Sequence, residues 1–376
     1  MKQNILDYID FRRQEALKLL LELAQIPAPS NHEERRAAFC RDWLLRQGAE
    51  RVYIDEAMNV VYPVGDDGHG PLTVYMAHSD VVFPDTEPLP LTVRDGRIYC
   101  PGIGDDTANA VALLMAAKYI AEQKLQPVEG GLLLVINAGE EGLGNLKGSR
   151  HILSSYGSRI RELISFDDHD CRGVNRAVGS RRFRVSVDTE GGHSFTDFGR
   201  KNAIAALAAL IGRLYAIQVP ALGRSTYNVG TITGGTSVNT IAQHAEMLFE
   251  FRSDEGEALD ILQGQFDALI GEFRSKGLRL TVETVGERPC GAAVDRERQE
   301  ALMARASAAA LRHYGRELSF GSGSTDCNIP LSLGIPAICV GCYNGSGAHT
   351  REEYVEMDSL LPGLKFAFEL ILHHFE

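Results

Sequence analysis

Acidic residues and histidines gather in five short clusters along the chain. The clusters are His78-Ser79-Asp80, Asp105-Asp106, Glu140-Glu141, Asp167-Asp168-His169-Asp170 and His349. Imidazole and carboxylate groups are ligands of divalent zinc. A pair of metals about 3.5–4 Å apart needs a histidine and a carboxylate on each metal, a bridging carboxylate, and a further carboxylate that acts as base. The histidines and carboxylates of these clusters can fill those roles.

Each cluster taken alone has an ordinary explanation. A single histidine such as His78 is more often a hydrogen-bonded structural residue than a metal ligand. Asp105 and Asp106 precede a helical segment, where they would cap the helix and meet its dipole. Glu140 and Glu141 would fit a solvated loop. Together the clusters are stronger evidence for a functional site, because apolar segments are not expected to end in uncompensated charge five times over.

Four of the clusters follow segments that are typical of buried strands. These segments are Leu72–Ala77, Gly131–Asn137, Leu163–Phe166 and Ile335–Val340. Ligands of open α/β sheets bind beyond the carboxyl ends of the strands, so we expect the clusters to converge on one crevice. Asp80 lies two residues after His78 and would share its side of the strand, so it is expected to orient the imidazole.

Strands alternate with helices in both terminal parts of the chain, which predicts an α/β fold with a doubly wound, mainly parallel sheet. From residue 182 to 289 the order changes to β-α-β-β-α-β, which predicts an inserted α+β domain with a four-stranded antiparallel sheet and two helices. We therefore expect a catalytic domain in two parts, 1–181 and 290–376. Asp95-Gly96 predicts a hairpin turn, and Ser30-Asn31-His32-Glu33 predicts a capping box that starts a helix.

Composition and charge exclude several classes of protein. The chain has 38 Lys and Arg against 50 Asp and Glu, a formal net charge of −12. Nucleic-acid and anionic-membrane surfaces need concentrated positive charge, so we expect neither partner. No segment has the roughly 18 uninterrupted apolar residues of a transmembrane helix. The seven dispersed cysteines indicate reduced thiols, and we expect a cytoplasmic location.

Taken in order, the motifs resemble the metal-site motifs of one zinc metallopeptidase family. They are His78-Ser79-Asp80, Gly104-Asp105-Asp106, Gly139-Glu140-Glu141-Gly142, Phe166-Asp167 and Gly347-Ala348-His349-Thr350. That family includes aminoacylase, carboxypeptidase G, succinyl-diaminopimelate desuccinylase and peptidase T, and the chain is most similar to the peptidase T-like members. Gly192-His193-Ser194 and the glycine-rich stretch from Gly230 to Asn239 resemble motifs of the family's lid or dimerisation domain.

The resemblance implies a pair of zinc ions, with cobalt or manganese as alternatives. His78 and Asp167 would each hold one metal, and Asp105 would bridge the two. Glu141 and His349 would complete the two sets of ligands.

The resemblance also implies how an amide bond would be cleaved. Glu140 would be the general base, a role that motif position assigns to it and that spacing alone leaves open between Glu140 and Glu141. His193, contributed by the partner subunit of a homodimer formed through the lid domain, would help to hold the oxyanion.

Four residues are candidates for substrate binding, and each has a structural alternative. Arg252 would pair with a substrate carboxylate, or it forms an ordinary interface salt bridge. Asn239 would hydrogen-bond the substrate, or it is a turn residue. Asp326 and Asn328 lie in a Ser-Thr-Asp-Cys-Asn stretch that resembles a peptide-facing loop, or they belong to a polar loop before a strand.

These expectations favour a dimeric two-zinc exopeptidase or amidase that acts on short peptides. The alternative within the same class is an N-acyl-amino-acid deacylase or desuccinylase. A different class is a non-catalytic metal-binding protein on an inherited hydrolase scaffold. The presence of the base Glu140 beside every type of ligand speaks against this last reading.

Overall fold

A computed structural model describes residues 1–376 and divides them into two compact units. Unit 1 consists of Met1–Ala177 and Ala292–Glu376. Unit 2 consists of Val178–Gly291. Two segments that are far apart in the sequence therefore build one unit, and the ligand candidates of the metal site all belong to it.

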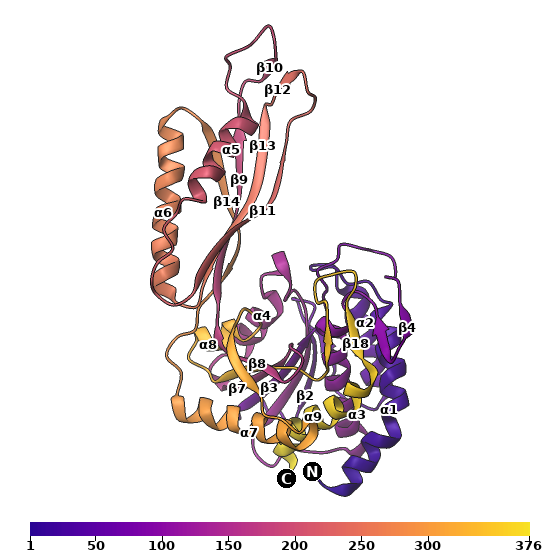
Figure 1. Ribbon diagram of the computed structural model, residues 1–376. Helices are drawn as coiled ribbons and strands as arrows, with labels where there is room; N and C mark the ends of the chain where they lie inside the picture. Colours follow the sequence, from indigo (N-terminus) through magenta and orange to yellow (C-terminus); the bar gives the residue numbers. More distant parts are fainter. The chain divides into compact units, whose positions relative to one another are not determined.

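An eight-stranded sheet forms the centre of unit 1 (Figure 1). In spatial order its strands are β1 (Tyr53–Ile54), β2 (Val60–Val64), β6 (Gly131–Asn137), β3 (Leu72–His78), β7 (Ile160–Phe166), β16 (Ala337–Val340), β8 (Arg172–Ala177) and β15 (Ser319–Gly323). The central strands β6, β3, β7 and β16 pair in parallel, as do β8 and β15. Every residue of β2, β3, β6 and β16 is buried, as in strands that are covered on both faces.

Helices cover both faces of this sheet. They are α1 (Gln3–Ala24), α2 (Glu34–Arg46), α3 (Asn109–Gln123), α4 (Lys147–Tyr156), α7 (Arg296–Tyr314), α8 (Asn328–Ser332) and α9 (Leu360–Leu372). Successive side chains of a strand point to opposite faces. Tyr75 and Ala77 therefore join the core with α1, α2, α3, α7 and α9, whereas Val74 and Met76 join the core with α4 and α8. None of the helices is long and apolar enough to cross a membrane.

A small antiparallel sheet lies next to the ligand-bearing turns. It consists of β17 (Gly345–Ser346), β18 (Tyr354–Glu356), β5 (Arg97–Tyr99) and β4 (Thr92–Arg94). The predicted Asp95-Gly96 hairpin is confirmed, because β4 and β5 pair across these two residues and both have positive φ. The pairing of β18 with β5 joins the segment that carries His349 to the segment that precedes Asp105.

Unit 2 is an antiparallel sheet with two helices against it. The sheet order is β11 (Ser225–Gly234), β13 (His244–Ser253), β9 (Gly179–Asp188) and β14 (Arg279–Arg288), and the helices are α5 (Ala203–Leu214) and α6 (Gly256–Ser275). A short pair, β10 (Gly192–His193) with β12 (Thr240–Ile241), lies outside this sheet. Phe266 of α6 stacks on Phe183 and Phe249, with ring centroids 4.5 and 5.6 Å away, so apolar burial joins the helix to the sheet.

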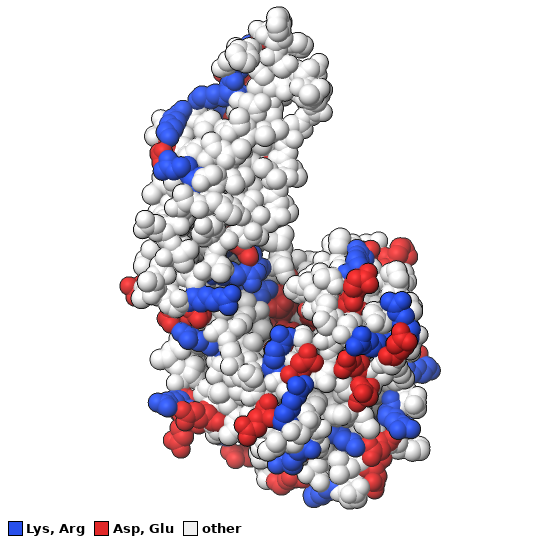
Figure 2. All heavy atoms as spheres, in the orientation of Figure 1, with Lys and Arg blue, Asp and Glu red and all other residues white.

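The predicted fold class is confirmed for both parts of the chain. The prediction missed α4, β8 and β15, because α4 is short and the two strands are rich in Gly and polar residues. The predicted capping box is wrong. Helix α2 begins at Glu34, the Ser30 hydroxyl donates to Asp80, and the Glu33 carboxylate binds Lys147 and the backbone N–H of Asn31. On the face drawn in Figure 2, acidic and basic residues of unit 1 are interspersed.

Candidate metal centre

The candidate ligands lie at one edge of the unit 1 sheet. His78 is the last residue of β3, Asp167 directly follows β7, and Glu141 follows β6 after a short turn. The carboxyl ends of parallel strands meet at the same edge, so these side chains come together as strand polarity requires. Asp105 lies in the irregular turn before α3, and His349 lies between β17 and β18.

His78 is buried and its ring is fixed by the backbone. Its Nδ1 lies 2.9 Å from the Asp80 carbonyl oxygen, which accepts the Nδ1 hydrogen and leaves Nε2 free to act as a ligand. Nε2 lies 3.0 Å from Asp105 Oδ1 and 3.8 Å from Asp167 Oδ1. The His78 imidazole and the Asp167 carboxylate thus lie on the same side of Asp105.

His349 occupies the other side of Asp105. Its Nε2 lies 3.1 Å from Asp105 Oδ2 and 3.0 Å from Glu141 Oε1. The two oxygens of Asp105 therefore face two different imidazoles. A carboxylate in this position can bridge two cations.

Each imidazole lies beside one carboxylate in addition to Asp105. His78 Nε2 is 3.8 Å from Asp167 Oδ1, and His349 Nε2 is 3.0 Å from Glu141 Oε1. Ligand atoms of His78, Asp105 and Glu141 also lie within 4.8 Å of one another, since β3 lies between β6 and β7 in the sheet. These distances favour a sharing of ligands that differs from the expected one, in which His78 and Asp167 hold different metals.

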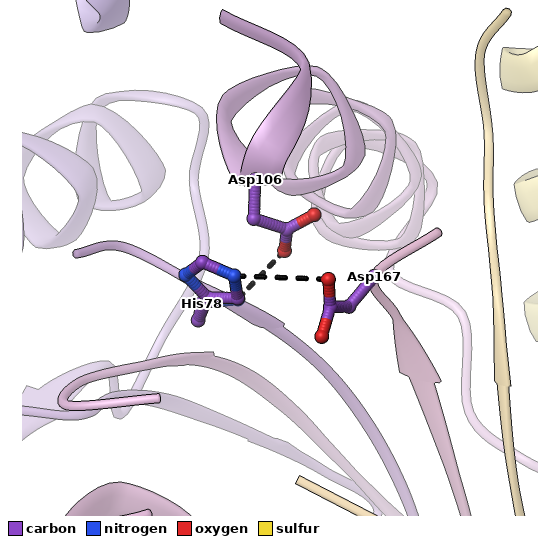
Figure 3. Close-up of side chains that lie close together, drawn as sticks. All are labelled: His78, Asp106 and Asp167. Atoms are coloured by element: carbon purple, nitrogen blue, oxygen red, sulfur yellow. Dashed lines mark hydrogen bonds and ion pairs between the residues drawn. The ribbon is translucent and has the colours of Figure 1, made fainter. Parts of the chain in front are cut away.

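Asp106 also approaches His78, as Figure 3 shows. Ligand atoms of His78, Asp106 and Asp167 all lie within 4.8 Å of one another. However, Asp106 Oδ2 accepts the backbone N–H of His78 at 2.8 Å, and Oδ1 accepts from the Asn109 amide at 2.7 Å. With both oxygens engaged, Asp106 ties the end of β3 to the start of α3, and Asp105 is the better placed ligand.

The Asp80 carboxylate holds the turn that carries Glu140 and Glu141. It accepts the backbone N–H of Glu140 at 3.0 Å, that of Glu141 at 2.9 Å, and the hydroxyl of Ser30 at 2.7 Å. Its distance to His78 Nδ1 is 3.6 Å. The backbone carbonyl of Asp80 therefore orients the His78 imidazole, and the Asp80 carboxylate positions the turn of Glu140 and Glu141.

Protons balance the charge of these crowded groups in the metal-free protein. Burial raises the pKa of Asp167 well above its usual value, and burial with the charges of Asp105 and Glu140 raises that of Glu141 to about 7. Burial opposes protonation of His78, but the neighbouring carboxylates outweigh it and hold its pKa well above the usual value. Hydrogen bonds with Asp105 and Glu141 raise the pKa of His349 to about 11.

The donor set fits two divalent cations. It supplies an imidazole and a carboxylate on each side of one shared carboxylate, and all are groups that zinc accepts. Bound cations would replace the protons on Asp167, His78 and His349 that balance the charge of the site.

The other expected residues of unit 1 are buried. Glu140 is 5% exposed and shares its turn with Glu141, but it belongs to neither group of ligand atoms. Asp326 accepts from the Asn137 amide at 2.6 Å, and burial raises its pKa to about 7. Asn328 accepts the backbone N–H of Thr325. Both side chains are buried, and their proposed contact with a substrate stays a prediction.

Three expected site residues belong to unit 2. His193 is exposed, and its Nδ1 accepts the backbone N–H groups of Phe195 and Thr196 at 3.3 and 3.4 Å. Asn239 is exposed and accepts from the hydroxyl of Ser237. Arg252 is half-buried and donates to Glu250 at 2.8 Å.

Sequence reasoning missed several residues that support the centre. Ser30 and Asn109 bind the carboxylates of Asp80 and Asp106, and Glu353 binds the backbone of the Asp105 turn. An acidic residue four positions after His349 is the one feature of the sequence that could have drawn attention to Glu353, and it does not indicate a bond to backbone.

The raised pKa values of the two histidines predict proton release on metal binding. At pH 7 the metal-free protein carries a proton on both His78 and His349, whereas a ligating imidazole must be neutral. Loading should release about two or more protons per chain, and affinity should rise with pH between 5 and 8. Calorimetry in buffers of different ionisation enthalpy measures this release. Metal binding without proton release would contradict the assignment of these ligands.

Comparison with known proteins agrees with this centre. The sequence profile of peptidase family M20/M25/M40 matches residues 74–373. Acetylornithine deacetylase of Myxococcus xanthus is 27% identical over 329 residues, which cover 81% of each chain. A tripeptidase of Staphylococcus aureus subsp. aureus Mu50 has a similar structure, with a TM-score of 0.75 and 24% identity over 96% of this chain and 98% of its own.

A further solved structure is similar over nearly its whole length. It is Bacillus subtilis YXEP, described as a dinuclear metal-binding peptidase of the M20 family, with a TM-score of 0.65 and 17% identity over 97% of this chain and 99% of its own. The profile match spans most of the chain and confirms the family that the motifs indicated. The chain belongs to peptidase family M20/M25/M40.

Proposed function

We propose that this chain is a metal-dependent hydrolase that cleaves the amide bonds of short peptides, as a di- or tripeptide exopeptidase. The observation that carries the proposal is the position of Asp105, whose two oxygens face two imidazoles from opposite sides. Glu140 lies on the same turn as the ligand candidate Glu141 but outside both ligand groups, which suits a separate base.

The residues divide the work as follows. Glu140 takes a proton from the attacking water and delivers it to the leaving nitrogen of the amide. Asp80 keeps Glu140 in place through the backbone of the turn. When bound, the metals would polarise the substrate carbonyl and lower the pKa of the water. His193 is proposed to stabilise the oxyanion.

The second candidate function is deacylation of N-acyl amino acids. It is favoured by the 27% identity with acetylornithine deacetylase over 81% of the chain, whereas the likeness to the tripeptidase favours peptides. Peptide cleavage and deacylation are both hydrolysis of an amide next to a free carboxylate or amine. The base Glu140 and the same metal ligands would therefore serve either reaction. A non-catalytic metal-binding role has less support, because the candidate base Glu140 is present and its turn is held by Asp80.

We further propose zinc as the resident metal, with cobalt or manganese as substitutes. We also propose a homodimer formed through unit 2, which would be the lid and dimerisation domain. The proposed location is the cytoplasm. The imidazole and carboxylate donors suit zinc. Arg252 is proposed to pair with the substrate carboxylate, because a guanidinium matches that group in a bidentate geometry. Asn239 is proposed as a second polar contact to the substrate.

Replacing Glu140 by Gln tests the proposed base. Glu140→Gln keeps the size of the side chain but removes its basicity, so kcat on di- and tripeptides or N-acetylated amino acids should fall by about 10²–10⁴-fold. Its metal content should stay equal to that of the wild type. Glu129→Gln, an exposed acidic residue outside the site, should change neither value. Full activity of Glu140→Gln, or wild-type turnover that resists a chelator, would refute the mechanism.

Arg252→Ala tests recognition of the substrate carboxylate. A lost charge-assisted contact should lower kcat/KM by roughly 10- to 100-fold for substrates with a free carboxylate, and much less for their amides. Arg184→Ala is the matched control, since Arg184 lies on β9 of the same sheet and pairs with Glu246 and Glu283. An equal loss on carboxylates and amides, or no loss on either, would count against this contact.

A further inference from the structure

Glu353 is a buried acid whose side chain accepts three backbone hydrogen bonds near the metal centre. It lies four residues after His349 and directly before β18, and it is 2% exposed. Its Oε2 accepts the N–H of Gly102 at 2.6 Å, and its Oε1 accepts the N–H groups of Gly104 and Asp105 at 2.9 and 2.8 Å. One carboxylate thus accepts three hydrogen bonds from the turn that presents Asp105.

The turn needs such a partner because its backbone is not helical. Gly102 has a φ of +74°, and Asp105 has φ −95° and ψ 95°, so the N–H groups here do not all meet carbonyls of a helix. Gly104 has no room for a side chain, since a Cβ would lie within 2.6 Å of the Tyr343 ring. Buried N–H groups without an acceptor are costly, and Gly102 and Gly104 are both buried. Glu353 supplies the missing acceptors.

The backbone of Glu353 fastens the same turn to the segment of His349. Its carbonyl oxygen accepts the N–H of Cys100 at 3.1 Å, and its N–H donates to the Thr350 carbonyl oxygen at 3.4 Å. The following strand, β18, pairs with β5, in the register Tyr354 to Tyr99. Two candidate ligands that are far apart in the sequence are therefore linked through one residue.

We infer that Glu353 is a positioning residue of the metal centre. By holding the backbone of Asp105, it directs one oxygen of that carboxylate toward His78 and the other toward His349. This inference rests on the proposed metal-dependent function. A fixed backbone matters most at the shared ligand, because an error in the position of Asp105 affects both metals at once.

Glu353→Gln is the direct test, because it keeps volume and burial. Glutamine has one acceptor oxygen, so its NH2 group must face at least one of the three N–H donors. Affinity for two zinc ions, measured by competition with a chelator well below the unfolding temperature, should fall by about 10- to 100-fold. The visible absorption spectrum of the cobalt-loaded protein should also change. Glu352→Gln, an exposed neighbour in the same loop, should bind metal like the wild type.

The outcomes separate the inference from the proposed function. If the wild type binds no metal, the proposed function fails. If the wild type binds two metals and folded Glu353→Gln binds them with the same affinity and the same cobalt spectrum, the inference is wrong and Glu353 only stabilises the fold. Should Glu353→Gln not fold, Glu353→Asp keeps the charge but shortens the reach, and the same loss of affinity is expected. Unchanged affinity in that variant would overturn the inference.

Discussion

Crowding of negative charge is the constraint on which the unit 1 site depends. Six carboxylates and two imidazoles meet at one edge of the sheet, and most of them are buried; the carboxylates are Asp80, Asp105, Asp106, Glu140, Glu141 and Asp167. Like charges in a poorly solvated place repel strongly. In the metal-free protein, protons on Asp167 and on both histidines reduce that repulsion. Divalent cations would do the same while leaving the carboxylates ionised.

Five of these six acids fall into two groups with different roles, and the sixth, Glu140, is the proposed base. Asp105, Glu141 and Asp167 each direct an oxygen toward the Nε2 atom of a histidine, as ligands would. Asp80 and Asp106 instead accept backbone N–H groups from a second element of the fold. Charge-assisted bonds of this kind are short and strong.

Asp80, Asp106 and Glu353, which we call the bracing acids, hold distant segments of unit 1 in a fixed arrangement. Asp80 joins the end of β3 to the turn after β6, and Asp106 joins the end of β3 to the start of α3. Glu353 joins the segment of His349 to the turn of Asp105. Each link uses backbone groups, so it fixes the path of the chain and not only one side chain. The ligands then need little adjustment when a cation enters.

Much of this could be predicted from the sequence, because strand polarity decides where the clusters lie. His78 ends β3, and Glu141 and Asp167 follow β6 and β7; all of β3 and β6 and the last four residues of β7 are buried. Parallel strands bring such ends together. Which carboxylate lies beside which imidazole could not be predicted, since it depends on the order of the strands in the sheet. The roles of Asp80 and Glu353 in binding backbone N–H groups could not be predicted from the sequence either, because a hydrogen bond to backbone leaves no pattern in the residue types.

Anomalous X-ray diffraction at the zinc absorption edge, on crystals of the zinc-loaded chain, would show whether Asp105 bridges two metals. We expect two peaks about 3.5–4 Å apart. One should contact His78 and Asp167, the other Glu141 and His349, with Asp105 reaching both. A single peak, or a pair bridged by Asp106 in place of Asp105, would contradict this expectation.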